Sequence, residues 1–243
     1  MVKLFADGAD YDSIVELSKN EKVVGFTTNP TLMREAGVEN YEEFSKKVIK
    51  YLAENRPNTS LSLEVFADEK EEMIHQARKI DSWGKEQDYD VYVKIPVQNT
   101  KGINNYDVID TLNFENVKLN VTAVFTTEQV VDIIERVVSE TPMIISIFAG
   151  RIADTGVNPE EIISESILYR KLVKPRTPIE FLWASSREAY NYVQAEKSGC
   201  EIITMSPDLI KKVDKFGKDL DLFSIETVQM FYNDAVKSGY RID

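Results

Sequence analysis

The chain has 243 residues, 43% of them hydrophobic and 29% charged, a composition typical of a globular protein with a sizeable core. Its net charge of −12 argues against nucleic acid or an anionic membrane surface as the main partner. The single cysteine, Cys200, excludes an internal disulfide, and no secretory signal or bilayer-spanning apolar stretch is recognisable, so we expect a soluble cytoplasmic protein.

Short β-branched and aromatic runs alternate along the chain with longer patterns of helical periodicity. The predicted strands cover residues 3–8, 22–28, 60–66, 91–97, 118–125, 142–150, 179–186 and 201–206. Amphipathic stretches lie between them, such as residues 40–55 and a segment that follows a capping threonine at Thr126. A helix-like tail occupies about residues 220–243.

Eight strand–helix units in a chain of this length predict one α/β domain over residues 1–243, a single (β/α)₈ TIM barrel with a C-terminal helical extension. The tail is expected to cover a barrel end or to clasp a neighbouring subunit. An open doubly wound sheet is the alternative fold. It is disfavoured because no glycine-rich phosphate loop follows the first strand.

Lys94 lies in the middle of VYVKIPV, an apolar run at residues 91–97. A buried lysine costs free energy unless it gains a partner or loses its charge. Burial favours the neutral amine, which is the form that attacks a carbonyl and forms a Schiff base. The structural alternative is a lysine that reaches solvent or pairs with a buried carboxylate.

Polar residues gather near the C-terminal ends of the predicted strands, where barrel enzymes carry their catalytic groups. They are Asp7, Thr27, Thr28, Asn29, Glu64, Lys94, Asn120, Thr122, Ser146, Arg151, Ser185 and Arg187. Simpler explanations exist: Asn29 is a good helix cap before Pro30, Glu64 is a counter-ion for Lys94, and both arginines suit a surface. The triplet Asp154-Thr155-Gly156 is interpreted as a turn.

Taken together, these residues suit carbon–carbon bond chemistry on a phosphorylated ketose. A neutral lysine attacks the carbonyl, carboxylates move protons, and arginines grip the phosphate. The chain has one histidine, His75, in a helix-like segment, which argues against multi-histidine zinc sites and Ser–His or Cys–His catalysis. We therefore expect neither a metal ion nor an organic cofactor.

The sequence resembles the transaldolase family. GFTTNPTLM at residues 25–33 is similar to the family signature, and VYVKIPV carries the lysine that matches the Schiff-base residue. The likeness continues, in order, through FADGAD, LSLEV, LNVTAVF, SIFAGRI and WASSRE. It spans roughly residues 4–210 and implies a barrel with the lysine on its fourth strand.

The resemblance also implies a role for each matching position. Lys94 forms the Schiff base, Glu64 moves protons through a water that Thr122 helps to hold, and Asp7 takes the C4 hydroxyl proton during cleavage. Asn29 and Asn120 bind the dihydroxyacetone unit, which Ser146 supports, and Arg151, Ser185 and Arg187 hold the phosphate. Thr28 and Phe148 complete the implied substrate-binding set.

A subfamily of compact homologues, the fructose 6-phosphate aldolases, differs from the transferases at four positions. This chain carries the transferase residue at each of them: Glu64, Asn120, Phe148 and Arg187. Its short length is similar to the compact branch. It departs from both at Gly8, Ile147, Trp183 and Ser186, of which Trp183 and Ser186 are expected to flank the phosphate.

The resulting prediction is a transaldolase that moves a dihydroxyacetone unit from a ketose phosphate to an aldose acceptor. The pentose phosphate pathway is the implied setting, sugar phosphates are the expected partners, and a homo-oligomer is the expected assembly. The alternatives are an aldolase that releases free dihydroxyacetone and a transaldolase for a modified or sulfonated sugar. The lone histidine disfavours a metal-dependent aldolase. The presence of both Lys94 and Glu64 disfavours a non-catalytic barrel that only binds sugar phosphates.

Overall fold

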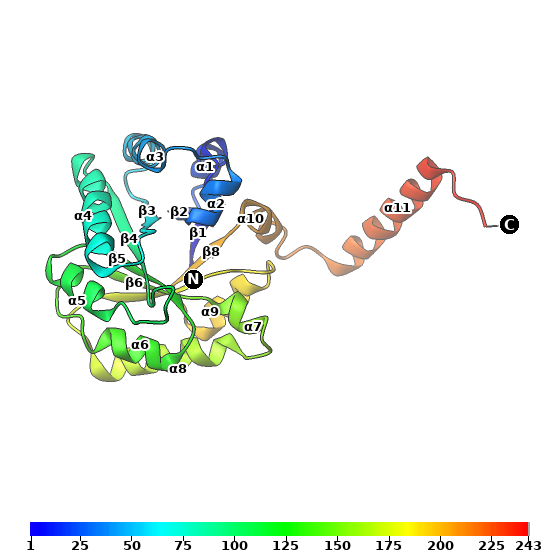
Figure 1. Ribbon diagram of the computed structural model, residues 1–243. Coiled ribbons are helices and arrows are strands. Elements are labelled where there is room, and N and C mark those ends of the chain that lie inside the picture. The colour runs from blue at the N-terminus through cyan, green and yellow to red at the C-terminus, as the bar shows by residue number, and fades with distance from the viewer. Residues whose placement is uncertain (243) are drawn as a thin grey trace.

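Eight parallel strands close into a barrel in the computed structural model, which describes residues 1–242 (Figure 1). Strand order follows chain order, and β8 pairs back onto β1. The strands are β1 (Lys3–Asp7), β2 (Val23–Thr27), β3 (Ser60–Glu64), β4 (Asp90–Pro96), β5 (Leu119–Val124), β6 (Met143–Ile147), β7 (Ile179–Trp183) and β8 (Ile202–Met205). The predicted (β/α)₈ barrel is confirmed, and Lys94 lies on its fourth strand.

Helices surround the barrel and connect successive strands. They are α1 (Tyr11–Ser18), α2 (Pro30–Glu35), α3 (Tyr41–Asn55), α4 (Lys70–Glu86), α5 (Tyr106–Phe114), α6 (Thr127–Ile134), α7 (Ala149–Ala153), α8 (Pro159–Val173), α9 (Asn191–Ser198), α10 (Pro207–Val213) and α11 (Leu220–Ser238). Each predicted strand extends one to three residues past the observed C-terminal end, because the residues that follow the strands belong to the loops or, for Ala149 and Gly150, to α7. Thr126 caps α6 as expected, through a reciprocal bond with Gln129.

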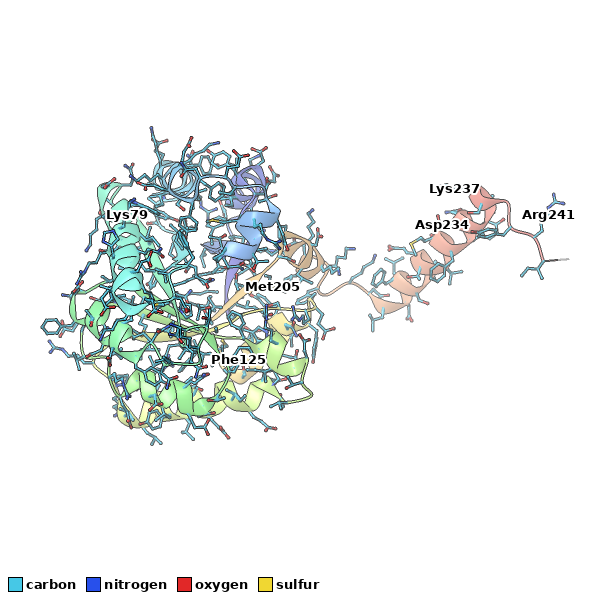
Figure 2. The ribbon with its side chains drawn as sticks, in the orientation of Figure 1. Lys79, Phe125, Met205, Asp234, Lys237 and Arg241 are labelled. Carbon is cyan, nitrogen blue, oxygen red and sulfur yellow. The ribbon has the colours of Figure 1, made fainter. Side chains whose placement is uncertain are left out.

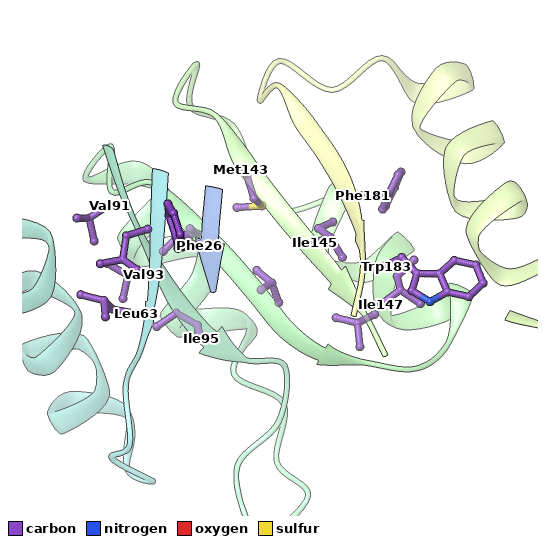
Figure 3. Close-up of a cluster of buried hydrophobic side chains, with 14 of the residues drawn as sticks. Phe26, Leu63, Val91, Val93, Ile95, Met143, Ile145, Ile147, Phe181 and Trp183 are labelled. Atoms are coloured by element: carbon purple, nitrogen blue, oxygen red, sulfur yellow. The ribbon is translucent and has the colours of Figure 1, made fainter. Parts of the chain in front are cut away.

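The alternation of side chains along each strand separates two apolar layers. Residues such as Leu63, Val93 and Ile145 point outward and pack under the helices, as Figure 3 shows. A smaller cluster of Phe5, Ile144, Leu182, Ala184 and Ile202 fills the inside of the barrel. The inner layer is apolar only in part, because polar residues share it with this cluster.

Gly25 of the signature segment has a structural reason to be glycine. A Cβ atom at this position would lie 2.5 Å from the ring of Phe5, the inward-facing residue that pairs with it across β1 and β2. The missing side chain therefore lets an aromatic ring fill the barrel beneath Asp7 and Thr27.

Helix α11 projects away from the barrel, beyond α10, and contributes no buried residue (Figures 1 and 2). In Figure 2, Asp234 and Lys237 lie on this helix with no other part of the chain around them. The predicted tail is thus helical over Leu220–Ser238, while residue 243 lies outside the described part.

None of the helices within residues 1–242 combines the length and the apolarity that crossing a membrane requires.

Candidate active site

Lys94 lies near the C-terminal end of β4, at the inner face of the barrel, with only 6% of its surface exposed. Its Nζ atom is 2.8 Å from Oε2 of Glu64 and donates a hydrogen bond of 2.8 Å to the Thr28 carbonyl. The parallel register pairs Glu64 with Lys94 across β3 and β4, so adjacent strands bring the two charges together. The predicted counter-ion contact between the two exists, and it places a carboxylate directly on the amine.

Asp7 faces the same space from the end of β1. Thr27, its register partner on β2, donates a hydrogen bond of 2.8 Å from Oγ1 to Asp7 Oδ1. Burial raises the pKa of Asp7 above that of an ordinary carboxyl group, and the nearby Glu64 charge adds to this. Lys94 and the Thr27 hydrogen bond lower the pKa of Asp7 but do not offset burial. The raised pKa makes the Asp7 carboxylate a stronger proton acceptor than an ordinary carboxylate.

A chain of side-chain hydrogen bonds lies beneath Lys94. Asn120, fully buried on β5, donates to Ser62 Oγ at 3.1 Å and accepts from Ser146 Oγ at 2.6 Å. These three residues point inward from β3, β5 and β6, and the bonds fix the orientation of the Asn120 amide. Asn120 also pairs with Lys94 in the strand register, so the floor of the site is rigid and polar.

Two hydroxyl groups in this region have no hydrogen-bond partner among residues 1–242. They are the Oγ1 atoms of Thr28 and Thr122, both buried. A bulge follows Thr122, where Ala123 adopts a positive φ of 57° and interrupts the register with β6. An unpaired buried hydroxyl costs free energy, so Thr122 is free to bond a ligand that enters the cavity it lines.

The inward-facing residues enclose a cavity of about 110 Å³ at the C-terminal ends of the strands. Eight predicted site residues line it: Asp7, Asn29, Lys94, Thr122, Ser146, Phe148, Arg151 and Ser185. Thr27, which is also among the polar residues noted at the strand ends, lines it too, together with Leu182, Ala184 and Thr204. A larger cavity of about 310 Å³ lies at the opposite barrel end beside Lys3 and Glu180, but its lysine is half exposed and paired with that glutamate at the surface.

Asn29 has both of the roles considered for it. Its side chain accepts a hydrogen bond of 3.0 Å from the Leu32 amide and so caps α2, with Pro30 at the first helical position. The same residue lines the cavity. The cap uses Oδ1 and leaves the Asn29 side-chain NH₂ group available as a donor.

The wall that carries the arginines depends on a close approach between two loops. Gly150, the second residue of α7, lies against the Ser185 carbonyl, and a Cβ atom there would come within 1.7 Å of that oxygen. Ser185 has a positive φ of 64°. The Gly150 amide also donates to the Ala184 carbonyl at 3.3 Å. This contact brings Arg151, one residue along α7, next to the loop that holds Arg187.

The two arginines differ in their surroundings. Arg151 lines the cavity, and its guanidinium lies 5.8 Å from the centre of the Phe148 ring. Arg187 instead pairs with Asp154, whose carboxylate accepts from Nη2 at 2.6 Å and from Nε at 3.2 Å. This pairing lowers the pKa of Asp154. The triplet that begins at Asp154 does form a turn, as predicted, and that turn positions an arginine at the rim.

Four predicted site residues do not line the cavity: Glu64, Thr28, Asn120 and Arg187. The first two contact Lys94 directly, Asn120 lies below it, and Arg187 is held by Asp154 at the rim. The expectation that Trp183 flanks the phosphate is wrong. Trp183 points outward from β7 and is buried with Phe181 beneath the helices, as Figure 3 shows, because only every second residue of a strand faces the barrel.

Two residues in this network were missed by sequence reasoning, Ser62 and Thr204. Ser62 alternates with leucines in β3, so the period-two pattern was a signal for it, whereas Thr204 is a single polar residue in the otherwise apolar β8. Elsewhere, Cys200 is buried, and burial raises the pKa of its thiol to about 12, which removes it as a nucleophile. His75 is exposed on α4, as expected.

The arrangement can therefore supply a buried amine, a proton-transferring carboxylate in contact with it, a second carboxylate across the cavity and a cation at the rim. Within residues 1–242, no group of three or more histidine, cysteine, aspartate or glutamate side chains is placed to hold a metal ion. The side chains present suit covalent chemistry at a carbonyl carbon.

Comparison with solved structures supports the barrel fold. The chain aligns with N-acetylneuraminate lyase from Mycoplasma synoviae with a TM-score of 0.54 and 15% identity, covering 96% of this chain and 80% of the other. Thiamine phosphate pyrophosphorylase from Pyrococcus furiosus gives a TM-score of 0.53 at 12% identity, covering 84% and 85%. At these identities the likeness concerns the fold alone.

Sequence relatives are closer. A probable transaldolase from Brucella melitensis is 30% identical over 241 residues, covering 99% of this chain and all of the relative. A probable transaldolase from Dehalococcoides mccartyi is 29% identical over 204 residues, covering 84% and 86%. The family model described as transaldolase/fructose-6-phosphate aldolase matches residues 4–242. Because this match runs through every strand of the barrel, the chain belongs to the transaldolase/fructose 6-phosphate aldolase family.

Proposed function

We propose that the protein is a transaldolase that moves a dihydroxyacetone unit between sugar phosphates through a Schiff base on Lys94. The observation that carries the proposal is the buried Lys94 amine, which lines a polar cavity together with Asp7 and contacts Glu64 at 2.8 Å. Family membership implies sugar-phosphate substrates, and the names of the relatives above support transfer.

In the first half-reaction, the neutral Lys94 amine attacks the C2 carbonyl of the ketose. The neutral amine forms when Glu64, 2.8 Å from Nζ, takes one proton from the Lys94 ammonium group and passes it to the C2 oxygen. Glu64 then takes the second proton that the nitrogen loses and passes it to the same oxygen, which leaves as water. The product is an iminium ion. Asp7 then takes the C4 hydroxyl proton while the C3–C4 bond breaks, and the bonding electrons move into an enamine on Lys94.

The second half-reaction reverses these steps with a new aldehyde. The enamine carbon attacks the acceptor carbonyl, and Asp7 returns its proton to the oxygen of the acceptor. Water then adds to the iminium carbon, and the new ketose is released from Lys94. Asp7 alternates between base and acid, which suits a carboxyl group whose pKa burial raises toward neutral pH.

The other predicted residues hold the substrate in this proposal. The dihydroxyacetone unit, or the water that takes part in the proton transfers by Glu64, binds to the free side-chain donor of Asn29 and to the hydroxyls of Thr28, Thr122 and Ser146. Asn120 orients Ser146. Phe148 contributes an aromatic wall against Arg151. The phosphate is assigned to Arg151, Ser185 and Arg187.

Transfer rather than free aldol cleavage is favoured by the side chains at the four discriminating positions. Glu64 contacts the amine, and Asn120 lies in the hydrogen-bonded floor, so both transferase residues are integrated into the site. The alternative of a modified or sulfonated sugar loses the support of Trp183, which points away from the cavity.

Borohydride trapping tests the covalent step. Reduction in the presence of fructose 6-phosphate is expected to add a dihydroxyacetone-derived mass to the peptide that contains Lys94. Lys94→Met and Lys94→Arg should give no adduct, because neither supplies a free amine. An adduct on another lysine, or equal trapping in Lys94→Met, would contradict the mechanism. Steady release of dihydroxyacetone without an acceptor aldose would assign the enzyme to the aldolases instead.

The proposal also includes a homo-oligomer, because α11 has an apolar face that the barrel of its own chain leaves uncovered. Ile225, Val228, Tyr232 and Val236 recur at helical spacing, and each is more than half exposed. Burial of this face against a second copy would remove it from water. Light scattering of the purified protein measures the assembly. The pentose phosphate pathway and a cytoplasmic location remain predictions, as does the absence of a cofactor.

A further inference from the structure

Thr204, near the end of β8, contacts the proposed proton acceptor through one intermediate residue. Its Oγ1 atom lies 2.5 Å from Oγ1 of Thr27, and Thr27 lies 2.8 Å from Asp7. Thr204 is 5% exposed and lines the cavity. Three strands, β8, β2 and β1, thus place two hydroxyl groups and a carboxyl group in one short chain.

The number of available protons decides the direction of this chain. An ionised carboxylate only accepts hydrogen bonds, so Thr27 must donate its single hydroxyl proton to Asp7. The Thr27 oxygen is then left as an acceptor. Thr204 must therefore donate to Thr27, and the chain is polarised from Thr204 through Thr27 toward Asp7. Hydrogen bonds aligned in this way strengthen one another.

We propose that Thr204 is a positioning residue that keeps Asp7 ionised and ready to accept the proton of the sugar hydroxyl. The inference rests on the proposed function, in which Asp7 is that proton acceptor. Thr204 acts only through Thr27, whose hydroxyl it orients, and it forms no bond to the substrate in the steps proposed above.

The surroundings of Asp7 make this support necessary. The charged groups around it are Lys94 on β4 and Arg151 on α7, which line the same cavity, and Glu64 on β3, which contacts Lys94. Lys94 favours the carboxylate, Glu64 opposes it, and burial opposes it most strongly. Hydrogen bonds that end on Asp7 therefore act against the two effects that would protonate it.

The backbone holds Thr204 in position. Thr204 pairs with Phe5 in the register of β1 and β8, two residues before Asp7. The Thr204 carbonyl accepts a hydrogen bond of 2.9 Å from the Ser186 hydroxyl, in the loop after β7. Ser186 departs from the family pattern, and this bond accounts for its hydroxyl: it ties the loop that carries Arg187 to the strand that carries Thr204.

The test compares Thr204→Val, which keeps the shape but loses the hydroxyl, with Thr204→Ser, which keeps the hydroxyl. In Thr204→Val, the acidic limb of the pH profile of kcat/KM should move to higher pH by about 0.1–0.7 unit. At a fixed pH on that limb, this shift lowers kcat/KM by about 1.3- to 5-fold. Thr27→Val, which removes the direct bond, should move it by about 1–2 units. Thr204→Ser should restore the wild-type limb.

A substrate-free measurement separates this inference from the proposed function. The infrared band of the Asp7 carboxyl group, identified by its loss in Asp7→Asn, should titrate with the same shift in Thr204→Val. Borohydride trapping on Lys94 should persist in that variant. An unshifted Asp7 titration in Thr204→Val overturns the inference even if trapping succeeds. Failure of trapping in the wild-type protein overturns the proposed function but leaves the infrared result valid.

Discussion

Replacement of Lys94 by methionine is expected to destabilise the protein as well as inactivate it. Glu64, whose side chain is 17% exposed, would lose the amine that lies 2.8 Å from its carboxylate. Removal of one partner of a buried pair costs about 3–5 kcal/mol. Because Glu64 retains partial contact with solvent, we expect a loss of about 2–3 kcal/mol in the free energy of unfolding.

For a chain of this size, that loss corresponds to a fall of about 4–12 °C in Tm. The informative comparison is the double variant Lys94→Met/Glu64→Gln, which removes both charges. Its Tm should return to that of the wild-type protein or exceed it, because a buried ion pair contributes little beyond the cost of desolvating its two charges. The pair would then be retained for chemistry at the expense of stability.

Thermal unfolding followed by circular dichroism measures the effect, with wild type, both single variants and the double variant at one chain concentration. The two variants that lack Lys94 should give no borohydride-trapped adduct. A Lys94→Met protein that melts with the wild type would refute the reasoning, since Glu64 would then not depend on the lysine. A double variant as unstable as Lys94→Met would show that lost packing, rather than an unpaired charge, causes the effect.

Other predictions follow from the same site. Activity should fall as the pH drops through the raised pKa of Asp7, because only its carboxylate accepts a proton, so the acidic limb should lie above the usual value of about 3.9 and disappear with Asp7→Asn. Arg187→Ala should lower kcat/KM about 10- to 150-fold for phosphorylated acceptors and much less for glyceraldehyde; equal losses in a normally melting protein would contradict a phosphate role. Asp154→Asn, which frees Arg187 from its carboxylate, should alter KM for the same phosphorylated acceptors while kcat for glyceraldehyde stays unchanged. Gly150→Ala should cost at least about 1–3 kcal/mol of stability, because its Cβ would meet the backbone of Ser185 at 1.7 Å. A normal melting curve would contradict this, because it would show that the two loops separate easily.

The barrel and its lysine were predictable because the information is local. Each strand is a short apolar run bounded by polar residues, and Lys94 stands out because nothing else in VYVKIPV is cationic. Parallel strands place all their C-terminal ends at one rim, so the polar residues found there had to converge once the barrel was assumed. Eight of the twelve predicted site residues line the cavity for this reason.

The faces of the strands were harder to assign. A shift of one residue in strand phase moves a side chain from the cavity to the helix layer. Trp183 was placed at the phosphate by its position in the chain alone, whereas its neighbours Leu182 and Ala184 are the residues that face the barrel. The phase of a short strand rimmed by polar residues on both faces is not evident until its neighbours are in place.

The barrel, the fourth-strand lysine and the set of polar residues at one rim are readable from the amino-acid pattern, since they follow from periodicity and composition along short segments. Which of those residues touch depends on how the whole chain packs. Thr204 meets Thr27 across 177 positions, and Arg187 meets Asp154 across 33. Such contacts depend on how the barrel closes, with β8 beside β1, and on how closely loops approach over glycines such as Gly150. No local pattern encodes those distances, because they result from the packing of the whole fold.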